Sequence, residues 1–371
     1  MASQQFVPDA RPYRICSYSL SNPHEDSAWF SLGLRLHGKE FSITVLESQF
    51  RNSPNRLREF LKYHAYLTSH EDTSEGEDDA CTAESNDVGG GQDMTIDDCF
   101  AWAVQPFIVL FNEIAPKPSP TLEITLDDYF NYDSYCCHLR ATYDSLEPGP
   151  VELLETIPSF IPEEYETESS NQENPEVSAL FPTFPLSVIE IVSDRPEDKF
   201  DEEPRLVRVQ GSEYFFKSFE ALGEDIGRSE IRKYEEMAKA NLSPESHISR
   251  LFGIAQDDQG KVVGIMLHRI HHENTTLEDV ILTTTPESTR KRWRDQIRQS
   301  LEALHAAGIA WGDARAGNVI VDVQGDAWIT NFAGGYTKGW VDKDRTGAIA
   351  SDIQGFSRIE ELLTTRGGAL V

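Results

Sequence analysis

A short segment near the end of the chain brings a carboxylate, a guanidinium and an amide close together. In "WGDARAGNV" (311–319) these groups belong to Asp313, Arg315 and Asn318. After a hydrophobic segment, "TNFAGG" (330–335) adds the amide of Asn331. A carboxylate can accept the proton of a hydroxyl group, a cation can neutralise a phosphate, and amide oxygens can bind a hard metal ion. These residue types are therefore suited to phosphoryl transfer from a nucleotide.

Phosphoryl transfer from ATP also needs a cation on the α- and β-phosphates and an acid that holds this cation. The segment "LVRVQGSEYFFKSFE" (206–220) predicts two strands that turn at Gly211, with Lys217 on the second strand. A helix is predicted over "GRSEIRKYEEMAKANL" (227–242), and Glu230 lies near the start of its apolar face. We therefore expect Lys217 to pair with Glu230, with Glu235 as the alternative partner.

Further elements must position these groups. "ISRLFGIAQDDQGKVVGIMLHRI" (248–270) predicts a hairpin. Its second strand ends at four residues whose backbone could hold adenine by hydrogen bonds: Leu267, His268, Arg269 and Ile270. The helix predicted over 290–309 ends at Gly308, a normal C-terminal signal.

Two short strands and a last helix are predicted after the 311–319 segment. "VIVD" and "AWIT" flank a turn at Gly325. "SDIQGFSRIEELL" (351–363) then begins a helix with Asp352 in its first turn.

This order and spacing resembles the protein-kinase-like superfamily and is similar to kinase-like proteins of filamentous fungi. The resemblance covers roughly residues 186–371, about half of the chain. It implies a bilobal domain over 183–371, with a small antiparallel-sheet lobe (183–270) and a short, truncated helical lobe (271–371). With the region before it, the expected fold class is α+β.

The resemblance also implies a role for each residue. Asp313 would orient the acceptor hydroxyl as a base, and Arg315 would face the γ-phosphate. Lys217 and Glu230 would form the ion pair on the phosphates of ATP. Asn318 and Asn331 would bind Mg²⁺, or Mn²⁺ in its place. Asp352 would anchor the backbone of the 311–319 segment.

The sequence departs from the family pattern at several positions. Trp311 replaces a loop histidine that mainly packs, which is a minor change. Asn331 replaces an aspartate, and Ala333 replaces a flexible glycine. Loss of one unit charge beside Mg²⁺ could cost on the order of 2–4 kcal/mol, or roughly 10–1,000-fold in metal-dependent steps. The segment 194–204, where a phosphate-covering turn is expected, contains no glycine and many acids, which repel phosphates.

Two functions are compatible with these features. The first is an ATP-dependent phosphotransferase of weakened activity, with Asp313 as base, acting on a protein hydroxyl or on a small molecule. The alternative is a catalytically impaired pseudokinase that serves as a binding or scaffold module. No Ala-Pro-Glu element follows Asn331, so a conventional peptide substrate is not specifically indicated.

The first part of the chain (1–140) is predicted to be a separate α+β region. Alternation over 28–48 predicts a strand pair that turns near His37 and Gly38, and helices are predicted over 55–67 and 97–114, the latter kinked or started at Pro106. Residues 121–132 predict a strand or a short helix. Residues from about 69 to 96 are acidic and glycine-rich, which predicts a disordered loop, and residues 141–182 predict an acidic, proline-bearing linker.

The composition limits the partners. The formal net charge of −30 disfavours binding to nucleic acid and to anionic membranes. The five cysteines have no framework spacing, and Cys136 and Cys137 are expected to be free thiols. No signal peptide is visible, and the apolar segment from Cys99 is interrupted by Pro106, which indicates a buried helix and not a membrane span. We therefore expect an intracellular protein in the cytoplasm, with the nucleus left open.

Overall fold

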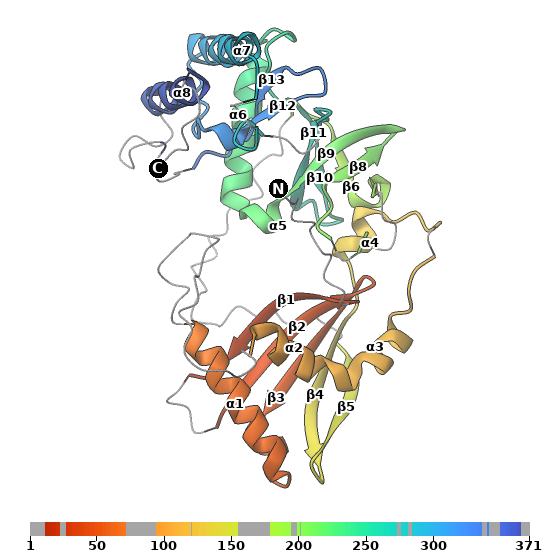
Figure 1. The fold of residues 1–371 in the computed structure, drawn as a ribbon. Helices are drawn as coiled ribbons and strands as arrows, with labels where there is room; N and C mark the ends of the chain where they lie inside the picture. The colour runs from red at the N-terminus through yellow and green to blue at the C-terminus, as the bar shows by residue number, and fades with distance from the viewer. Residues whose placement is uncertain are drawn as a thin grey trace. The chain divides into compact units, whose positions relative to one another are not determined.

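The chain divides into two α+β units. The computed structural model describes residues 12–22, 27–71, 94–119, 121–154, 179–193, 199–200, 202–272, 276–280, 284–335, 340 and 349–364. Unit 1 consists of Met1–Ile124, Asp128–Glu168 and Ser193–Glu203. Unit 2 consists of Thr125–Asp127, Ser169–Val192 and Pro204–Val371. Figure 1 shows the elements of each unit.

Unit 1 is built on a five-stranded sheet of order β1-β2-β3-β4-β5. Its strands are Arg14–Leu20, Trp29–Leu36, Lys39–Leu46, Ser134–Thr142 and Ser145–Leu153. All neighbours are antiparallel except β3 and β4, which are parallel. The predicted turn between β2 and β3 is confirmed, because His37 (φ 47°) and Gly38 (φ 83°) both have positive φ there.

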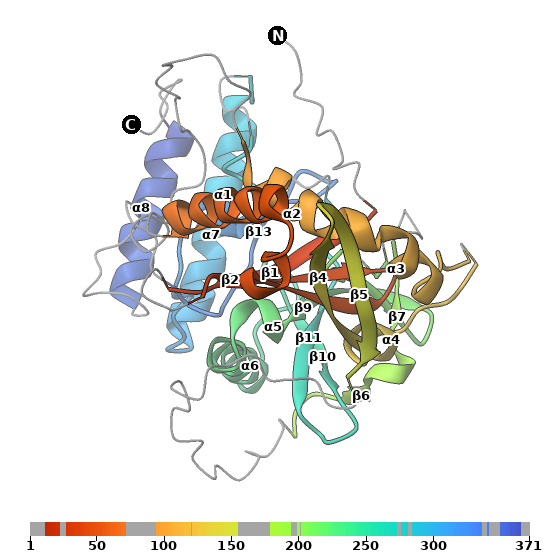
Figure 2. The ribbon, with the colours of Figure 1, turned by 90° about the horizontal axis from the view of Figure 1, so that it is seen from below.

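Helices α1 (Pro54–Glu71), α2 (Ile96–Val104) and α3 (Ile108–Ile114) lie on one face of this sheet (Figures 1 and 2). The helix predicted over 97–114 is interrupted by a 3₁₀ turn at Gln105–Phe107, because Pro106 lacks the N–H of a regular helix. Stacked aromatic rings fill the core beneath the helices. Phe41 and Phe111, for example, have centroids 4.0 Å apart.

The linker predicted over 141–182 begins too early. Strand β5 occupies Ser145–Leu153 and pairs with β4 from Thr142 to Tyr135, through a turn at Tyr143 and Asp144. Pro148 and Gly149 interrupt the apolar–polar alternation of this strand, which hid it in the sequence. Residues 155–178 lie outside the described part of the chain.

Helices extend into both ends of the segment at about 69–96 that was predicted to be a disordered acidic loop. Helix α1 continues to Glu71 and α2 begins at Ile96, where the side chain of Thr95 accepts a hydrogen bond from Asp98 N. Residues 72–93 lie outside the described residues. The segment 121–132, predicted as a strand or a short helix, contains α4 (Leu126–Phe130).

Unit 2 contains a six-stranded sheet of order β6-β10-β11-β9-β8-β7. Its strands are Thr183–Pro185, Leu251–Gln256, Val262–His268, Ser212–Ser218, Leu206–Val209 and Glu190–Ile191. Only β6 and β10 run parallel. The predicted turn before Lys217 is confirmed at Gln210 and Gly211. The glycine-free segment 194–204 lies between β7 and β8, and its residues 194–198 and 201 are outside the described part.

Helix α6 (Glu224–Lys239) buries Ile231, Tyr234 and Met237 in the core of unit 2. This core continues through α7 (Glu287–Ala306), α8 (Ile349–Thr364) and the hairpin of β12 (Val319–Val321) and β13 (Ala327–Ile329). Helices α7 and α8 lie side by side in both views (Figures 1 and 2). The helix predicted over 290–309 is thus confirmed, and Gly308 follows its end with φ 75°.

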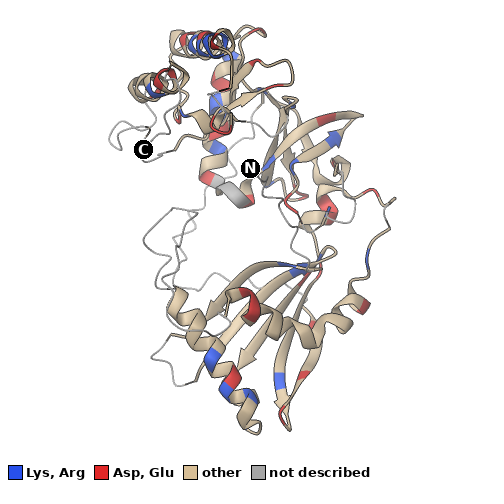
Figure 3. Ribbon diagram, viewed as in Figure 1, with Lys and Arg blue, Asp and Glu red and all other residues tan. Residues whose placement is uncertain are grey.

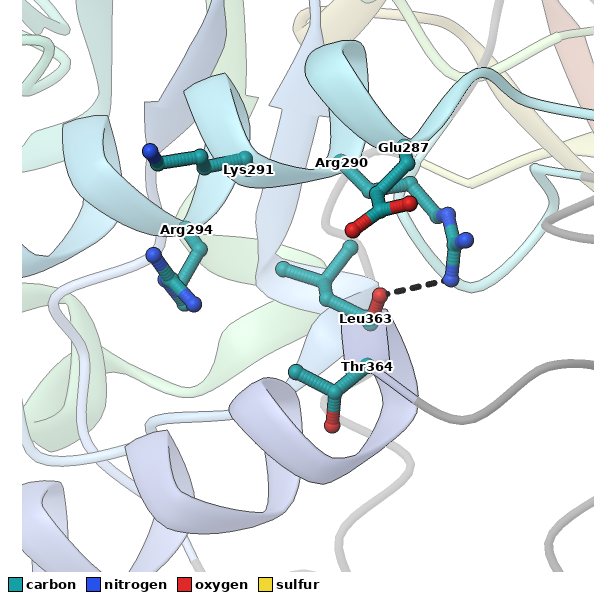
Figure 4. A pocket seen from close by; sticks show the side chains of 6 residues that line it. All are labelled: Glu287, Arg290, Lys291, Arg294, Leu363 and Thr364. Atoms are coloured by element: carbon teal, nitrogen blue, oxygen red, sulfur yellow. Dashed lines mark hydrogen bonds between the residues drawn. The ribbon is translucent and has the colours of Figure 1, made fainter.

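The two helices are joined at one end by a buried arginine. Arg290 donates a hydrogen bond from Nη1 to the carbonyl oxygen of Leu363, at 2.8 Å (Figure 4). This bond satisfies a carbonyl in the last turn of α8 that has no partner within the helix. A small cavity here is lined by Glu287, Arg290, Lys291, Arg294, Leu363 and Thr364.

Charge is unevenly distributed over unit 2. Helix α7 carries five of the 33 Lys and Arg residues of this acidic chain (Figure 3). These are Arg290, Lys291, Arg292, Arg294 and Arg298. Among the described residues, no helix is both long and apolar enough to span a bilayer.

Candidate functional site

A cavity of about 790 Å³ in unit 2 brings most of the predicted site residues together. Its lining comes from β8, β9, α6, the end of β11 and the segments around β12 and β13. The lining residues are Arg205, Leu206, Phe215, Lys217, Glu230, Ser249, Leu267, His268, Arg269, Ile270, His272, Arg315, Ile320, Thr330 and Asn331. Of the ten predicted site residues, only Asp313 and Asn318 are not among these. Both are buried and connect to the lining through Arg315 and Asn331.

Lys217 lies on β9 and contacts two acceptors. Its Nζ is 2.6 Å from Glu230 Oε2 and 2.7 Å from Asn331 Oδ1. The Glu230 side chain is fully buried, whereas that of Lys217 is 17% exposed. A buried carboxylate needs a paired charge and further donors, and Glu230 has both, because Oε1 accepts a bond from Phe332 N at 3.2 Å. Glu230, and not the alternative Glu235, is thus the partner of Lys217.

Asn331 links Lys217 to the 311–319 segment. Its backbone has φ 63°, a left-handed conformation that asparagine tolerates better than most residues. Its Nδ2 donates to Asn318 Oδ1 at 3.2 Å. The next residue, Phe332, is buried against the ring of Tyr234. Burial raises the pKa of Tyr234, and the charge of Glu230 adds to this shift.

Asp313 is held by its neighbours in the same segment. Its side chain is 8% exposed, and Oδ2 accepts bonds from Asn318 Nδ2 at 2.6 Å and from Arg315 Nε at 3.3 Å. Asn318 Nδ2 also donates to the carbonyl oxygen of Asp313. Arg315 further lies 3.8 Å from Glu278. The carboxylate is therefore fixed in orientation by short local contacts.

Asp352 holds this segment by its backbone. Its Oδ2 accepts from Trp311 N at 2.7 Å and its Oδ1 accepts from Gly312 N at 2.8 Å. His305 Nε2 lies 2.9 Å from Oδ2. The anchoring contact expected of Asp352 is thus present, and it lies at the buried start of α8. Trp311 packs in the core, with Nε1 bonded to Thr330 O.

The segment from Leu267 to Ile270 comprises the last two residues of β11 and the two that follow, and it lines the cavity. The N–H of His268 donates to Arg250 O, so that this donor is already used. Burial, with the charge of Arg250, lowers the pKa of His268. Arg269 pairs with Glu213 on β9.

The sequence did not single out several residues that line the cavity. His272 is the clearest of these, because its Nδ1 is buried and has no hydrogen-bond partner among the described residues. Burial lowers its pKa, as does the charge of Arg269. Arg205 and Phe215 were also missed. Strand alternation could have indicated them, because Arg205 directly precedes β8 and Phe215 lies two residues before Lys217 on β9.

The two predicted metal ligands do not fit a resident Mg²⁺ ion. Mg²⁺ in proteins is usually bound by one or two carboxylates together with phosphates and water, in strict octahedral geometry. Asn318 and Asn331 offer neutral carbonyl oxygens, and both already accept hydrogen bonds, from Asn331 Nδ2 and Lys217 Nζ respectively. The nearby carboxylate of Asp313 is bonded to Asn318 and Arg315. Among the described residues, no three His, Cys, Asp or Glu side chains cluster as a metal site.

Comparison with known sequences adds no assignment. The chain shows no significant match to a protein-family model or to a curated protein.

Proposed function

We propose that unit 2 is a bilobal, protein-kinase-like domain that binds ATP in the cavity and acts as an ATP-dependent phosphotransferase. The sheet with α6 would form the small lobe, and the part with α7 and α8 the short helical lobe. The proposal rests on one observation. The Lys217 ammonium, fixed by buried Glu230, and the segment Leu267–Ile270 line the same cavity, next to Asp313.

The lining suits a nucleotide. Apolar side chains that can cover a planar base are contributed by Leu206, Phe215, Leu267, Ile270 and Ile320. Cationic side chains that can bind phosphates are contributed by Arg205, Lys217, Arg269 and Arg315. A small-molecule site typically combines an apolar wall with a few such charged groups, in a volume of this order.

The residues around Asp313 support a transfer step. In the proposed reaction the oxygen of an acceptor hydroxyl forms a bond to the γ-phosphorus, while the bond from that phosphorus to the β–γ bridging oxygen breaks and ADP leaves. The Asp313 carboxylate accepts the hydroxyl proton, Lys217 holds the phosphates, and Arg315 faces the transferred group. The acceptor is a hydroxyl of a protein or of a small molecule.

A second function is favoured by one contact. The carbonyl oxygen of Asn331 accepts a bond from Lys217, where a metal-dependent enzyme needs a charged metal ligand. This change favours a pseudokinase, a nucleotide-binding module that serves as a scaffold. Both functions share the ATP site and differ in transfer.

The test uses the full chain and ATP labelled at the γ-phosphate. Saturating ATP, at about a hundredfold its Kd, should raise the free energy of unfolding by about 2.7 kcal/mol. Label transfer to the chain itself or to casein, or release as phosphate, is then compared with the Asp313→Asn variant. Transfer that this variant loses supports the phosphotransferase. ATP binding with equal label transfer in both proteins supports the pseudokinase, and absence of ATP binding overturns both.

A further inference from the structure

We propose that the cavity holds the phosphates of its nucleotide through the cations of the chain itself, without a divalent metal ion. This inference rests on the nucleotide site proposed above and states how that site neutralises its ligand.

The lining of the cavity is cationic in a strongly acidic chain. Among the described residues, four basic side chains line it, those of Arg205, Lys217, Arg269 and Arg315, against the single carboxylate of Glu230. The whole chain has a formal net charge of −30. A cleft lined by one sign of charge raises the local concentration of ions of the opposite sign. The cavity therefore attracts a polyphosphate that the rest of the chain repels.

The cations differ in how firmly they are already paired. Arg205, which directly precedes β8, is exposed and forms no ion pair within the described residues. The ion pairs of Arg315 with described residues are both long, 3.3 Å to Asp313 and 3.8 Å to Glu278. Arg269 pairs with Glu213, which does not line the cavity. Arg205 and Arg315 can thus turn to phosphate oxygens at little cost in lost contacts, and such charge-assisted bonds are strong.

The groups expected to hold a metal ion are linked in one chain of hydrogen bonds. Lys217 Nζ donates to Asn331 Oδ1, Asn331 Nδ2 donates to Asn318 Oδ1, and Asn318 Nδ2 donates to Asp313 Oδ2. A metal ion could reach the amide oxygens only by displacing these donors, and would gain no charged ligand by doing so. Mg²⁺ gives up its bound water reluctantly, and neutral oxygens alone compensate poorly for the loss of that water.

Asparagine in place of aspartate at position 331 also favours metal-free binding. An aspartate at position 331 would place a negative charge beside the phosphates unless a metal ion neutralised it. The amide of Asn331 brings no such charge and leaves the Lys217 ammonium facing the cavity with a neutral neighbour. Metal-free ATP therefore meets cations and no additional carboxylate in the lining.

The test is a titration of the full chain with ATP by isothermal calorimetry, once in EDTA and once in excess Mg²⁺, at equal ionic strength. We expect the two dissociation constants to agree within about threefold, since Asn318 and Asn331 give the metal ion no charged ligand. The Asn331→Asp variant should bind ATP in EDTA about tenfold more weakly than the wild type, with affinity restored by Mg²⁺.

A pair of exposed arginines provides the matched control. Arg205→Gln should weaken binding in EDTA by about five- to tenfold, because a phosphate loses a charged donor. Arg232→Gln, on the exposed side of α6, removes the same charge outside the cavity and should leave the affinity unchanged. Binding in Mg²⁺ but not in EDTA would overturn this inference and leave the nucleotide site standing. Absence of binding in both conditions would instead overturn the proposed function.

Discussion

The amide oxygen of Asn331 lies 2.7 Å from the ammonium nitrogen of Lys217. The same nitrogen lies 2.6 Å from Oε2 of Glu230. The lysine therefore bridges a buried carboxylate and a neutral amide. With an aspartate at 331, the same lysine would lie between two negative charges. The amide at 331 therefore leaves the site with one negative charge fewer than a carboxylate at this position would give it.

The first prediction places a carboxylate at this position. Under the proposed function, Asn331→Asp should increase Mg²⁺-dependent transfer of the γ-phosphate by roughly 10–1,000-fold, because it gives the metal ion a charged ligand worth about 2–4 kcal/mol. The backbone of residue 331, with φ 63°, accommodates aspartate as well as asparagine. Transfer is measured with labelled ATP in Mg²⁺ and in EDTA.

The control for this variant is the double change Asn331→Asp with Asp313→Asn, which keeps the new ligand and removes the proposed base. It should transfer no more label than Asp313→Asn alone. If the single variant shows no gain in Mg²⁺, Asn331 is not the residue that limits transfer.

A second prediction concerns the partner of Lys217. Glu230→Gln should lower the free energy of unfolding by about 1–3 kcal/mol, because the partly buried Lys217 ammonium loses its ionic partner. Glu235→Gln on the same helix is the matched control, and should change stability by less than about 0.5 kcal/mol. Urea unfolding measures both. Equal losses in the two variants would show that the Lys217–Glu230 contact is not specific in its effect.

Local sequence patterns predicted much of unit 2 because its elements carry strong local signals. The turn at Gly211, the helix end at Gly308 and the strands around Gly325 follow from residues that favour positive φ or end a helix. Glu230 could be chosen over Glu235 because it adjoins the face of Ile231 and Tyr234, which is the buried face of α6.

The remaining features depend on contacts between distant residues. Strand β5 was missed because its pairing with β4, and not its own alternation, makes it a strand. The bonds of Asn331 to Lys217 and Asn318 join residues 114 and 13 positions apart. Hydrophobic periodicity in the sequence does not indicate such long-range contacts. For the same reason His272 could not be recognised, since its burial depends on the packing around the cavity.

A third prediction tests Asp352, whose carboxylate holds the backbone just before Asp313. Asp352→Asn should lower the free energy of unfolding by about 2–4 kcal/mol, because an amide has one acceptor oxygen and would turn its NH₂ group toward a backbone N–H of Trp311 or Gly312. Glu360→Gln, on the same helix, removes only a partly exposed pair with Arg298 and should cost less than about 1 kcal/mol. Chemical denaturation followed by tryptophan fluorescence compares the two. A variant at 352 as stable as the wild type would contradict the buried anchor.

The last prediction concerns pH and rests on His272. Burial and the nearby Arg269 lower its pKa below the ordinary value of 6.5. The unfolded chain therefore binds a proton at this residue more readily than the folded chain does, and the stability of the fold falls as the pH drops through 6.5 toward the lowered pKa. Above 6.5 the histidine is neutral in both states and this loss is absent.

His272→Gln removes this group, so that the drop in unfolding free energy between pH 7.5 and pH 5.5 should be smaller than in the wild type. Urea unfolding at the two pH values measures the drop, and the comparison cancels the contributions of the many carboxylates. His271→Gln is the matched control, since the neighbouring residue is exposed, and it should show the same drop as the wild type. A drop in His272→Gln equal to that of the control would mean that protonation of His272 does not oppose folding, and that its buried Nδ1 is reached by water in solution.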